Sequence, residues 1–71
     1  MPKIYTPKQT IAKFKKLGFV EDRQSGSHKI FYNPNIGQRA VIPYLLKELP
    51  KGTLASILRE SQVSKKEFEK V

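Results

Sequence analysis

The residue best suited to chemistry in this sequence is its single histidine, His28, which ends the tripeptide Gly26-Ser27-His28. Imidazole is the one side chain whose ordinary pKa lies near neutrality, so His28 can take up or release a proton at physiological pH. Gly26 lets the backbone pass close to a phosphate group, whose oxygens exposed N–H groups can contact. The motif indicates acid–base chemistry beside a phosphate. The alternative interpretation is a surface histidine at a strand edge with no chemical role.

The charge balance narrows the range of partners. The 71 residues include 14 Lys and Arg but only 6 Asp and Glu, which gives a formal net charge of +8. A chain of this charge favours polyanions: a nucleic acid, an anionic membrane surface or an acidic protein. Charge alone does not choose among the three.

RNA fits both observations, because its ribose 2′-hydroxyl supplies the nucleophile and the protein adds only a base, an acid and a cation. A histidine acting as acid or base typically contributes about 10²–10⁴-fold. The candidate cations beside the phosphate are Lys29, Arg23 and Lys47. The second proton-transfer group remains open between Tyr32, Tyr44, a lysine and water. Ser27 is interpreted as a turn residue rather than a nucleophile, because no Asp or Glu has an evident role in orienting His28.

Other features exclude several classes of protein. The chain has no cysteine, so it has neither disulfides nor a cysteine-based zinc or iron–sulfur site. One histidine and six scattered acids also argue against a metal site, and we expect no cofactor. No apolar stretch approaches the roughly 20 residues of a membrane span. Met1–Tyr5 lacks the long apolar part of a secretory signal, so we expect a cytoplasmic protein.

The first element that the sequence predicts is an amphipathic helix. Thr6 and Gln9 have the spacing of a capping box around Pro7, and Gly18 is a natural end because glycine adopts the left-handed conformation. The apolar face holds Ile11, Phe14 and Leu17, with Ala12 beside them. The opposite face holds Lys8, Lys13, Lys15 and Lys16. These lysines either serve solubility or contact phosphates, a role for which we select Lys13 and Lys16.

Three strands are predicted next, over residues 19–24, 28–33 and 38–43, with short turns that imply an antiparallel meander. Phe31 and Tyr32 on the second strand are candidates either for the core or for stacking on bases. A second helix begins between Pro50 and Thr53, and Ser64 with Glu67 caps a short third helix. This order predicts a single α+β domain over residues 1–71. It is a two-layer sandwich of the double-stranded-RNA-binding type, with helices on one face and the other face open.

Four motifs, in this order and spacing, resemble the HicA family, the toxin half of bacterial and archaeal toxin–antitoxin modules. They are Leu17-Gly18-Phe19, Arg23-Gln24-x-Gly26-Ser27-His28, Val41-Ile42-Pro43 and Gly52-Thr53-Leu54-x-x-Ile57-Leu58. The resemblance implies a metal-independent endoribonuclease that cuts messenger RNA, with His28 essential and Gly26 and Ser27 completing its motif. It also implies a HicB antitoxin that covers the active site. Leu45 departs from the pattern, because many family members carry a second histidine at that position.

Two other functions compete with this interpretation. A non-catalytic RNA-binding module with the same fold would contact phosphates and 2′-hydroxyls through its lysines. A peripheral membrane protein would use the lysine-bearing first helix, but that helix has few apolar residues and no tryptophan. We therefore expect RNA and an antitoxin protein as partners, no membrane contact, and a monomeric free toxin.

Overall fold

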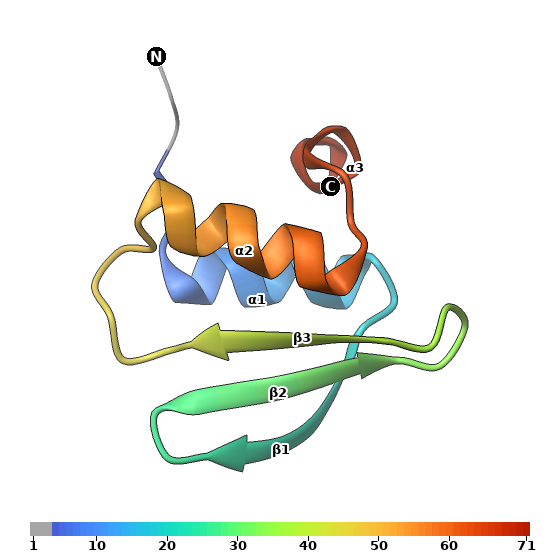
Figure 1. Cartoon of the computed structure of the whole chain (residues 1–71), viewed down its shortest axis with the longest axis horizontal. Coiled ribbons are helices and arrows are strands. Elements are labelled where there is room, and N and C mark those ends of the chain that lie inside the picture. The colour runs from blue at the N-terminus through green and yellow to red at the C-terminus, as the bar shows by residue number, and fades with distance from the viewer. Residues whose placement is uncertain (1–3) are drawn as a thin grey trace.

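Six elements follow one another along residues 4–71, the part of the chain that the computed structural model describes. Their order is α1 (Pro7–Lys16), β1 (Val20–Ser25), β2 (His28–Asn33), β3 (Gln38–Pro43), α2 (Lys51–Ser61) and α3 (Lys65–Lys70) (Figure 1). The three strands form an antiparallel sheet in the order β1-β2-β3, so the predicted α+β arrangement is confirmed. Residues 1–3, part of the N-terminal segment for which no secretory signal is predicted, lie outside the described residues.

Local capping sets where α1 begins and ends. The Thr6 hydroxyl accepts from the Gln9 backbone N–H at 3.1 Å, and the Gln9 side chain accepts from the Thr6 N–H at 3.0 Å. This reciprocal pair satisfies two N–H groups that the first turn of a helix leaves free. Gly18 has a φ of +99°, a conformation that side-chain-bearing residues rarely adopt, and it ends α1 as predicted. The same reciprocal capping, between Ser64 and Glu67, starts α3.

The second and third strands have the predicted bounds, whereas β1 begins one residue later than predicted. Phe19, expected as the first residue of β1, instead turns its ring into the core and packs edge-on against Phe14 with centroids 5.0 Å apart. β1 therefore pairs from Val20 onward, and it contains an irregularity between Glu21 and Arg23.

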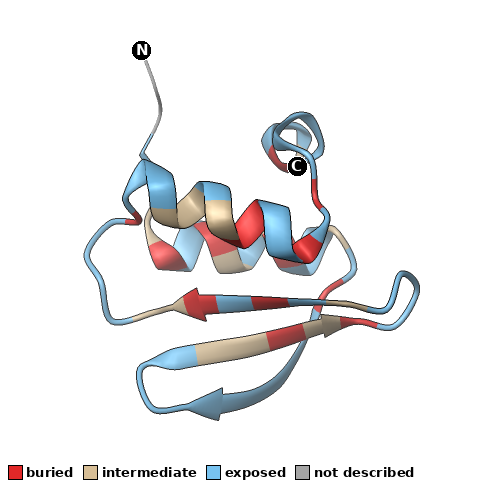
Figure 2. Cartoon of the chain, viewed as in Figure 1, coloured by how far each residue is buried: buried red, intermediate tan, exposed pale blue. Residues whose placement is uncertain are grey.

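The helices cover only part of one sheet face. Phe14 of α1, Phe31 of β2 and Ile42 of β3 are fully buried between the two layers. Every residue of β1 is exposed, and Figure 2 shows β1 and the turn that follows it as one exposed ribbon beyond the helices. The expected open face is therefore present, and the β1–β2 hairpin also extends past the helix layer.

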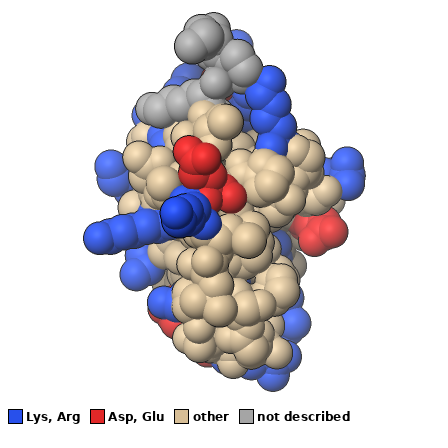
Figure 3. All heavy atoms as spheres, turned by 90° about the vertical axis from the view of Figure 1, so that its left-hand side faces the viewer, with Lys and Arg blue, Asp and Glu red and all other residues tan. Residues whose placement is uncertain are grey.

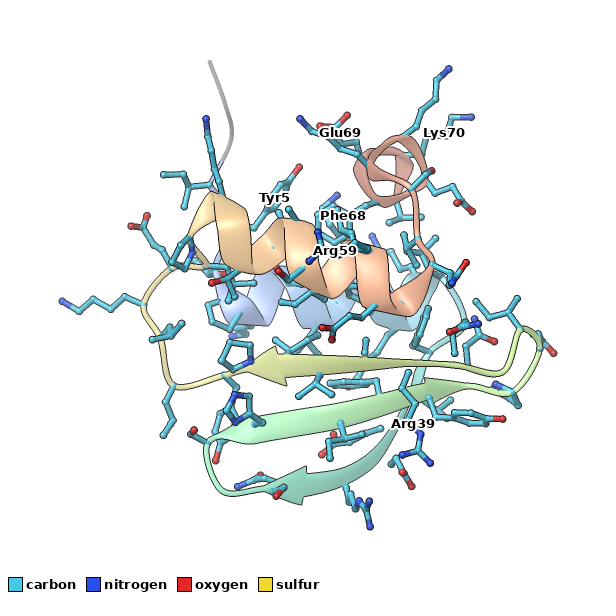
Figure 4. The ribbon with its side chains drawn as sticks, in the orientation of Figure 1. Tyr5, Arg39, Arg59, Phe68, Glu69 and Lys70 are labelled. Atoms are coloured by element: carbon cyan, nitrogen blue, oxygen red, sulfur yellow. The ribbon has the colours of Figure 1, made fainter. Side chains whose placement is uncertain are left out.

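The third helix packs onto the outer side of the other helices. Phe68 is buried against Tyr5 and Phe14, with ring centroids 5.0 and 5.8 Å away respectively. Figure 4 shows the Tyr5 and Phe68 side chains directed toward each other below α3. Within residues 4–71, no helix has both the length and the apolar character to cross a membrane.

Candidate catalytic histidine and RNA-binding face

The turn between β1 and β2 determines where His28 lies. Ser25 pairs with His28, so Gly26 and Ser27 form a two-residue hairpin turn. Gly26 has a φ of +58° whereas Ser27 has a negative φ, which is the pattern of a type II′ turn with glycine in first position. A Cβ placed on Gly26 would meet nothing within 4 Å, so the space above the turn is open. His28 follows directly as the first residue of β2, and its side chain is exposed.

Alternation along β2 assigns His28 to the open face of the sheet. Successive side chains of a strand point to opposite faces, so Phe31, buried under the helices, defines the helix-covered face. Lys29 and Asn33 share that face with Phe31. His28, Ile30 and Tyr32 point the other way, and Tyr32 is partly exposed. Of the two aromatic candidates, Phe31 is a core residue and Tyr32 lies on the open face.

Arg23 is the predicted cation that lies on the same face as His28. It pairs with Ile30, while Ser25 pairs with His28, so Arg23 is the diagonal neighbour of His28 across the two strands. Such neighbours have backbones about 7–8 Å apart, which a long side chain spans. An Arg23 guanidinium and a His28 imidazole can therefore contact the same phosphodiester.

The sequence reasoning missed a second arginine on this face, Arg39 of β3. It pairs with Tyr32 and is exposed, and Figure 4 shows it projecting from the sheet. The signal was present in the alternation of β3, because Arg39 and Val41 are separated by Ala40, which is buried. Its partner Tyr32 is four residues from His28 in β2, so Arg39 lies about 13 Å from His28 along the strand direction at a rise near 3.3 Å per residue.

Ser27 lies beside the imidazole without the geometry of a nucleophile. Its hydroxyl oxygen is 3.5 Å from Nδ1 of His28, whereas a nucleophile activated by a base lies within about 2.6–3.2 Å of it. This placement agrees with the interpretation of Ser27 as a turn residue.

Lys29 lies on the opposite face of the sheet from His28. Its ammonium is 5.3 Å from the centroid of the Tyr44 ring, and the Tyr44 hydroxyl contacts Gln24 and the Gly26 carbonyl on that same side. Residues adjacent in a strand are separated by the sheet, so neither Lys29 nor Tyr44 faces a phosphate held at His28. Of the two tyrosines considered for proton transfer, only Tyr32 shares the face of His28, and it is about four residues away along β2.

The helical lysines are also remote from His28. The Lys13 ammonium donates to the Val71 carbonyl at 2.7 Å and to the Phe68 carbonyl at 3.3 Å, so it stabilises the C-terminal end of α3. Lys16 is exposed at the end of α1 that adjoins β1, whereas the Gly26-Ser27 turn lies at the other end of the sheet (Figure 1). Five residue steps along β1 separate these ends by about 17 Å. The structure brings neither Lys13 nor Lys16 to the histidine.

Residues 7–63 match the profile of a family described as the HicA toxin of bacterial toxin–antitoxin systems. The chain belongs to the HicA toxin family. The match includes the turn with His28 and all three strands, and α3 follows it in sequence. A comparison with curated proteins finds no match.

In this HicA toxin, the loop over residues 44–50 lies beside the turn that carries His28. The Tyr44 N–H donates to the Ser27 carbonyl at 3.1 Å, and Lys47 is exposed further along the loop. Leu45 and Leu46 are 70% and 46% exposed. Figure 3 views this end of the molecule and shows mostly uncharged residues, with an acidic and a basic group near the middle and further Lys and Arg side chains around the edge. The end of the sheet that carries His28 is therefore exposed and mostly uncharged, and it includes two exposed leucines.

Proposed function

We propose that this toxin is a metal-independent endoribonuclease that cuts messenger RNA, with His28 as its catalytic acid or base. The observation that carries the proposal is the shared placement of His28 and Arg23 on one open face, next to a turn whose glycine leaves room for a phosphate. An imidazole and a guanidinium at diagonal positions provide proton transfer and charge stabilisation at one phosphodiester.

The reaction that these groups support is internal transfer of the phosphate. The ribose 2′-oxygen attacks the adjacent phosphorus as its proton leaves, and the bond from phosphorus to the 5′-oxygen breaks when that oxygen gains a proton. The products are a 2′,3′-cyclic phosphate and a 5′-hydroxyl. His28 transfers one of the two protons, and the Arg23 guanidinium offsets negative charge on the phosphoryl oxygens. Water or a group of the RNA transfers the other proton, because Tyr44 faces the other side of the sheet and Tyr32 lies four residues from His28 along β2, about 13 Å away.

The shape of the site favours single-stranded RNA laid along the sheet. Tyr32 and Ile30 offer a flat, partly exposed surface on which unstacked bases can lie. Arg23 and Arg39 flank this surface from β1 and β3 and can contact phosphates on both sides of it. Phosphate contacts position a nucleic acid without reading its sequence, so base preference would come from the Tyr32 region.

A toxin of a toxin–antitoxin module has an antitoxin partner, and we propose that here it is a HicB-type protein that covers His28. The exposed Leu45 and Leu46 lie next to the turn and offer apolar contact area to a protein, whereas an RNA backbone gains little from them. Modification of His28 by an imidazole-specific reagent tests this placement. Strong protection in the complex is expected, and equal modification of the free and bound toxin would contradict it.

The test of the activity compares the wild-type toxin with His28→Ala in the presence of a metal chelator. The wild type should cleave RNA and arrest growth, while His28→Ala should fold normally, as judged by circular dichroism, and do neither. Cleavage by His28→Ala at a rate near that of the wild type would contradict the catalytic role. RNA binding without cleavage by the wild type would favour the non-catalytic RNA-binding module.

A further inference from the structure

A side-chain tie crosses β2 on the face opposite His28. The Gln24 amide nitrogen on β1 donates to the hydroxyl oxygen of Tyr44, the first residue after β3. Between them, the Lys29 ammonium lies 5.3 Å from the centroid of the Tyr44 ring. Gln24 pairs directly with Lys29 in the sheet. The tie therefore joins the ends of all three strands at the level of the Gly26-Ser27 turn.

Tyr44 also holds the turn itself through both residues of that turn. Its backbone N–H donates to the Ser27 carbonyl at 3.1 Å, which extends the pairing of β2 and β3 by one residue. Its hydroxyl donates to the Gly26 carbonyl at 3.5 Å, a long hydrogen bond. One tyrosine thus contacts Gln24 before the turn, both carbonyls within it, and Lys29 after His28.

The turn has little other support. All of β1 and both turn residues are exposed, and the helix layer covers β2 and β3 only. β2 pairs with β3 as far as His28, but β1 is an edge strand, so β1 and the turn have β2 as their one neighbour in the sheet. Without the tie, the end of the hairpin that carries His28 would be free to fluctuate. Proton transfer requires the imidazole to lie within about 2.6–3.2 Å of the atom that gains or loses the proton, and small misplacements reduce the rate strongly.

We propose that Tyr44 is a positioning residue, which fixes the His28 turn against the end of β3 through its hydroxyl and its ring. The inference rests on the proposed function of His28, although the hold on the turn is a property of the free protein. Tyr44 acts through the backbone of residues 26–28 and makes no contact with the reacting atoms.

The test removes only the hydroxyl, with Tyr44→Phe, and compares kcat and KM for RNA cleavage with those of the wild type. We expect kcat to fall about tenfold and KM to change less than twofold, because a displaced imidazole affects the reaction rather than RNA binding. Gln24→Ala should have a similar effect. The double variant should be no slower than the slower single variant, since both remove one shared hydrogen bond. Tyr5→Phe, which removes a hydroxyl from the ring that packs against Phe68 of α3, is the matched control and should keep the wild-type kcat.

Amide hydrogen exchange of the free protein provides a readout that needs no activity. Exchange of the Tyr44 N–H, which is bonded to Ser27, should be faster in Tyr44→Phe than in the wild type, while exchange in α1 stays the same. Wild-type kcat in Tyr44→Phe, or a raised KM with unchanged kcat, would overturn the proposal. If His28→Ala still cleaves RNA, the proposed function fails instead, and the exchange rates still show whether the tie holds the turn.

Discussion

At the scale of single residues, the position of His28 in its strand decides which groups can act with it. A strand places its neighbours on alternate faces, so Lys29, adjacent in sequence, is directed away, while Arg23 on the neighbouring strand is directed to the same side. The residues that can assist a histidine in a strand are thus on the neighbouring strands, on the same face of the sheet, and not next to it in sequence. We therefore expect the Arg23 guanidinium to offset negative charge on the phosphate beside His28.

Replacing Arg23 by Gln should lower kcat/KM for RNA cleavage by about tenfold. Removing a preorganised donor from an enclosed site costs about 10²–10³ in rate, but solvent screens an exposed arginine, which reduces the effect. Steady-state kinetics on a short single-stranded RNA measure it. Arg59→Gln removes the same charge from an exposed position on α2, where the guanidinium contacts only Ser56 among the hydrogen bonds described, and it should change kcat/KM less than twofold. Equal losses in both variants would show that net charge, not position, matters.

At the scale of elements, Asn33 joins α1 to the sheet and to the β2–β3 turn. Its amide nitrogen donates to the Leu17 carbonyl at 3.2 Å, and its amide oxygen accepts from the Asn35 N–H at 2.9 Å. The side chain is 4% exposed and packs 3.3 Å from the position of a Cβ on Gly18. One buried amide therefore fixes the end of the helix that precedes β1.

Asn33→Ala should lower the free energy of unfolding by about 2 kcal/mol, because it empties the space of a buried side chain and removes the partners of the Leu17 carbonyl and the Asn35 N–H, both in partly buried hydrogen bonds. Urea denaturation with an unchanged m-value measures the loss. Asn35→Ala is the matched control, since its side chain is exposed and its backbone N–H is retained. That variant should change stability by no more than about 0.5 kcal/mol. Equal losses in the two variants would contradict the role of the Asn33 amide.

The sequence predicts elements well wherever the signal is local. Thr6 and Ser64 start helices through contacts three residues away, and the two turns that flank β2 are rich in Gly, Pro, Ser and Asn. Pairings across the fold are different. Lys13 was predicted to lie on a basic helix face that contacts phosphates. Its ammonium instead donates to the carbonyls of Phe68 and Val71, which lie 55 and 58 residues later in the sequence, and no local pattern reveals such a contact. The sheet face on which Lys29 lies could have been predicted from the sequence. Alternate residues of a strand share a face, so taking Phe31 as a core residue places Lys29 on the helix-covered side.

At the scale of the whole molecule, the positive charge is spread over two sides. Arg23 and Arg39 lie on the open sheet face, whereas Lys15 and Lys16 are exposed on α1 in the helix layer. A single RNA strand that passes His28 along the sheet meets the arginines and not the lysines. The net charge of +8 speeds the encounter with RNA from any direction, but only the contacted charges release counterions on binding.

The salt dependence of RNA binding should therefore distinguish the two sides. Each phosphate contact on a single strand contributes about 0.7 to the slope of log K against log salt, so Arg23→Gln with Arg39→Gln should make the slope shallower by about 1.4. Lys15→Gln with Lys16→Gln removes the same charge and should change the slope by less than half as much. Titrations of catalytically inactive His28→Ala backgrounds at several salt concentrations measure both. A larger change in the lysine pair would place the RNA along α1, as first predicted for Lys16.

The two ends of the sheet present different exposed apolar residues to an antitoxin. Leu45 is exposed beside the His28 turn, and Ile36, 50% exposed, lies on the β2–β3 turn at the opposite end of the sheet. A carboxylate buried in an apolar interface is costly, so Leu45→Asp should weaken antitoxin binding about tenfold or more, while Ile36→Asp leaves it unchanged. Both variants should still cleave RNA, because neither side chain carries a group to which the proposed reaction assigns a role. Calorimetric titration of each variant with the antitoxin measures binding, and an RNA cleavage assay of the same variants measures activity. Equal weakening by both substitutions would mean that the antitoxin recognises the charge of the toxin rather than the exposed leucines beside its histidine.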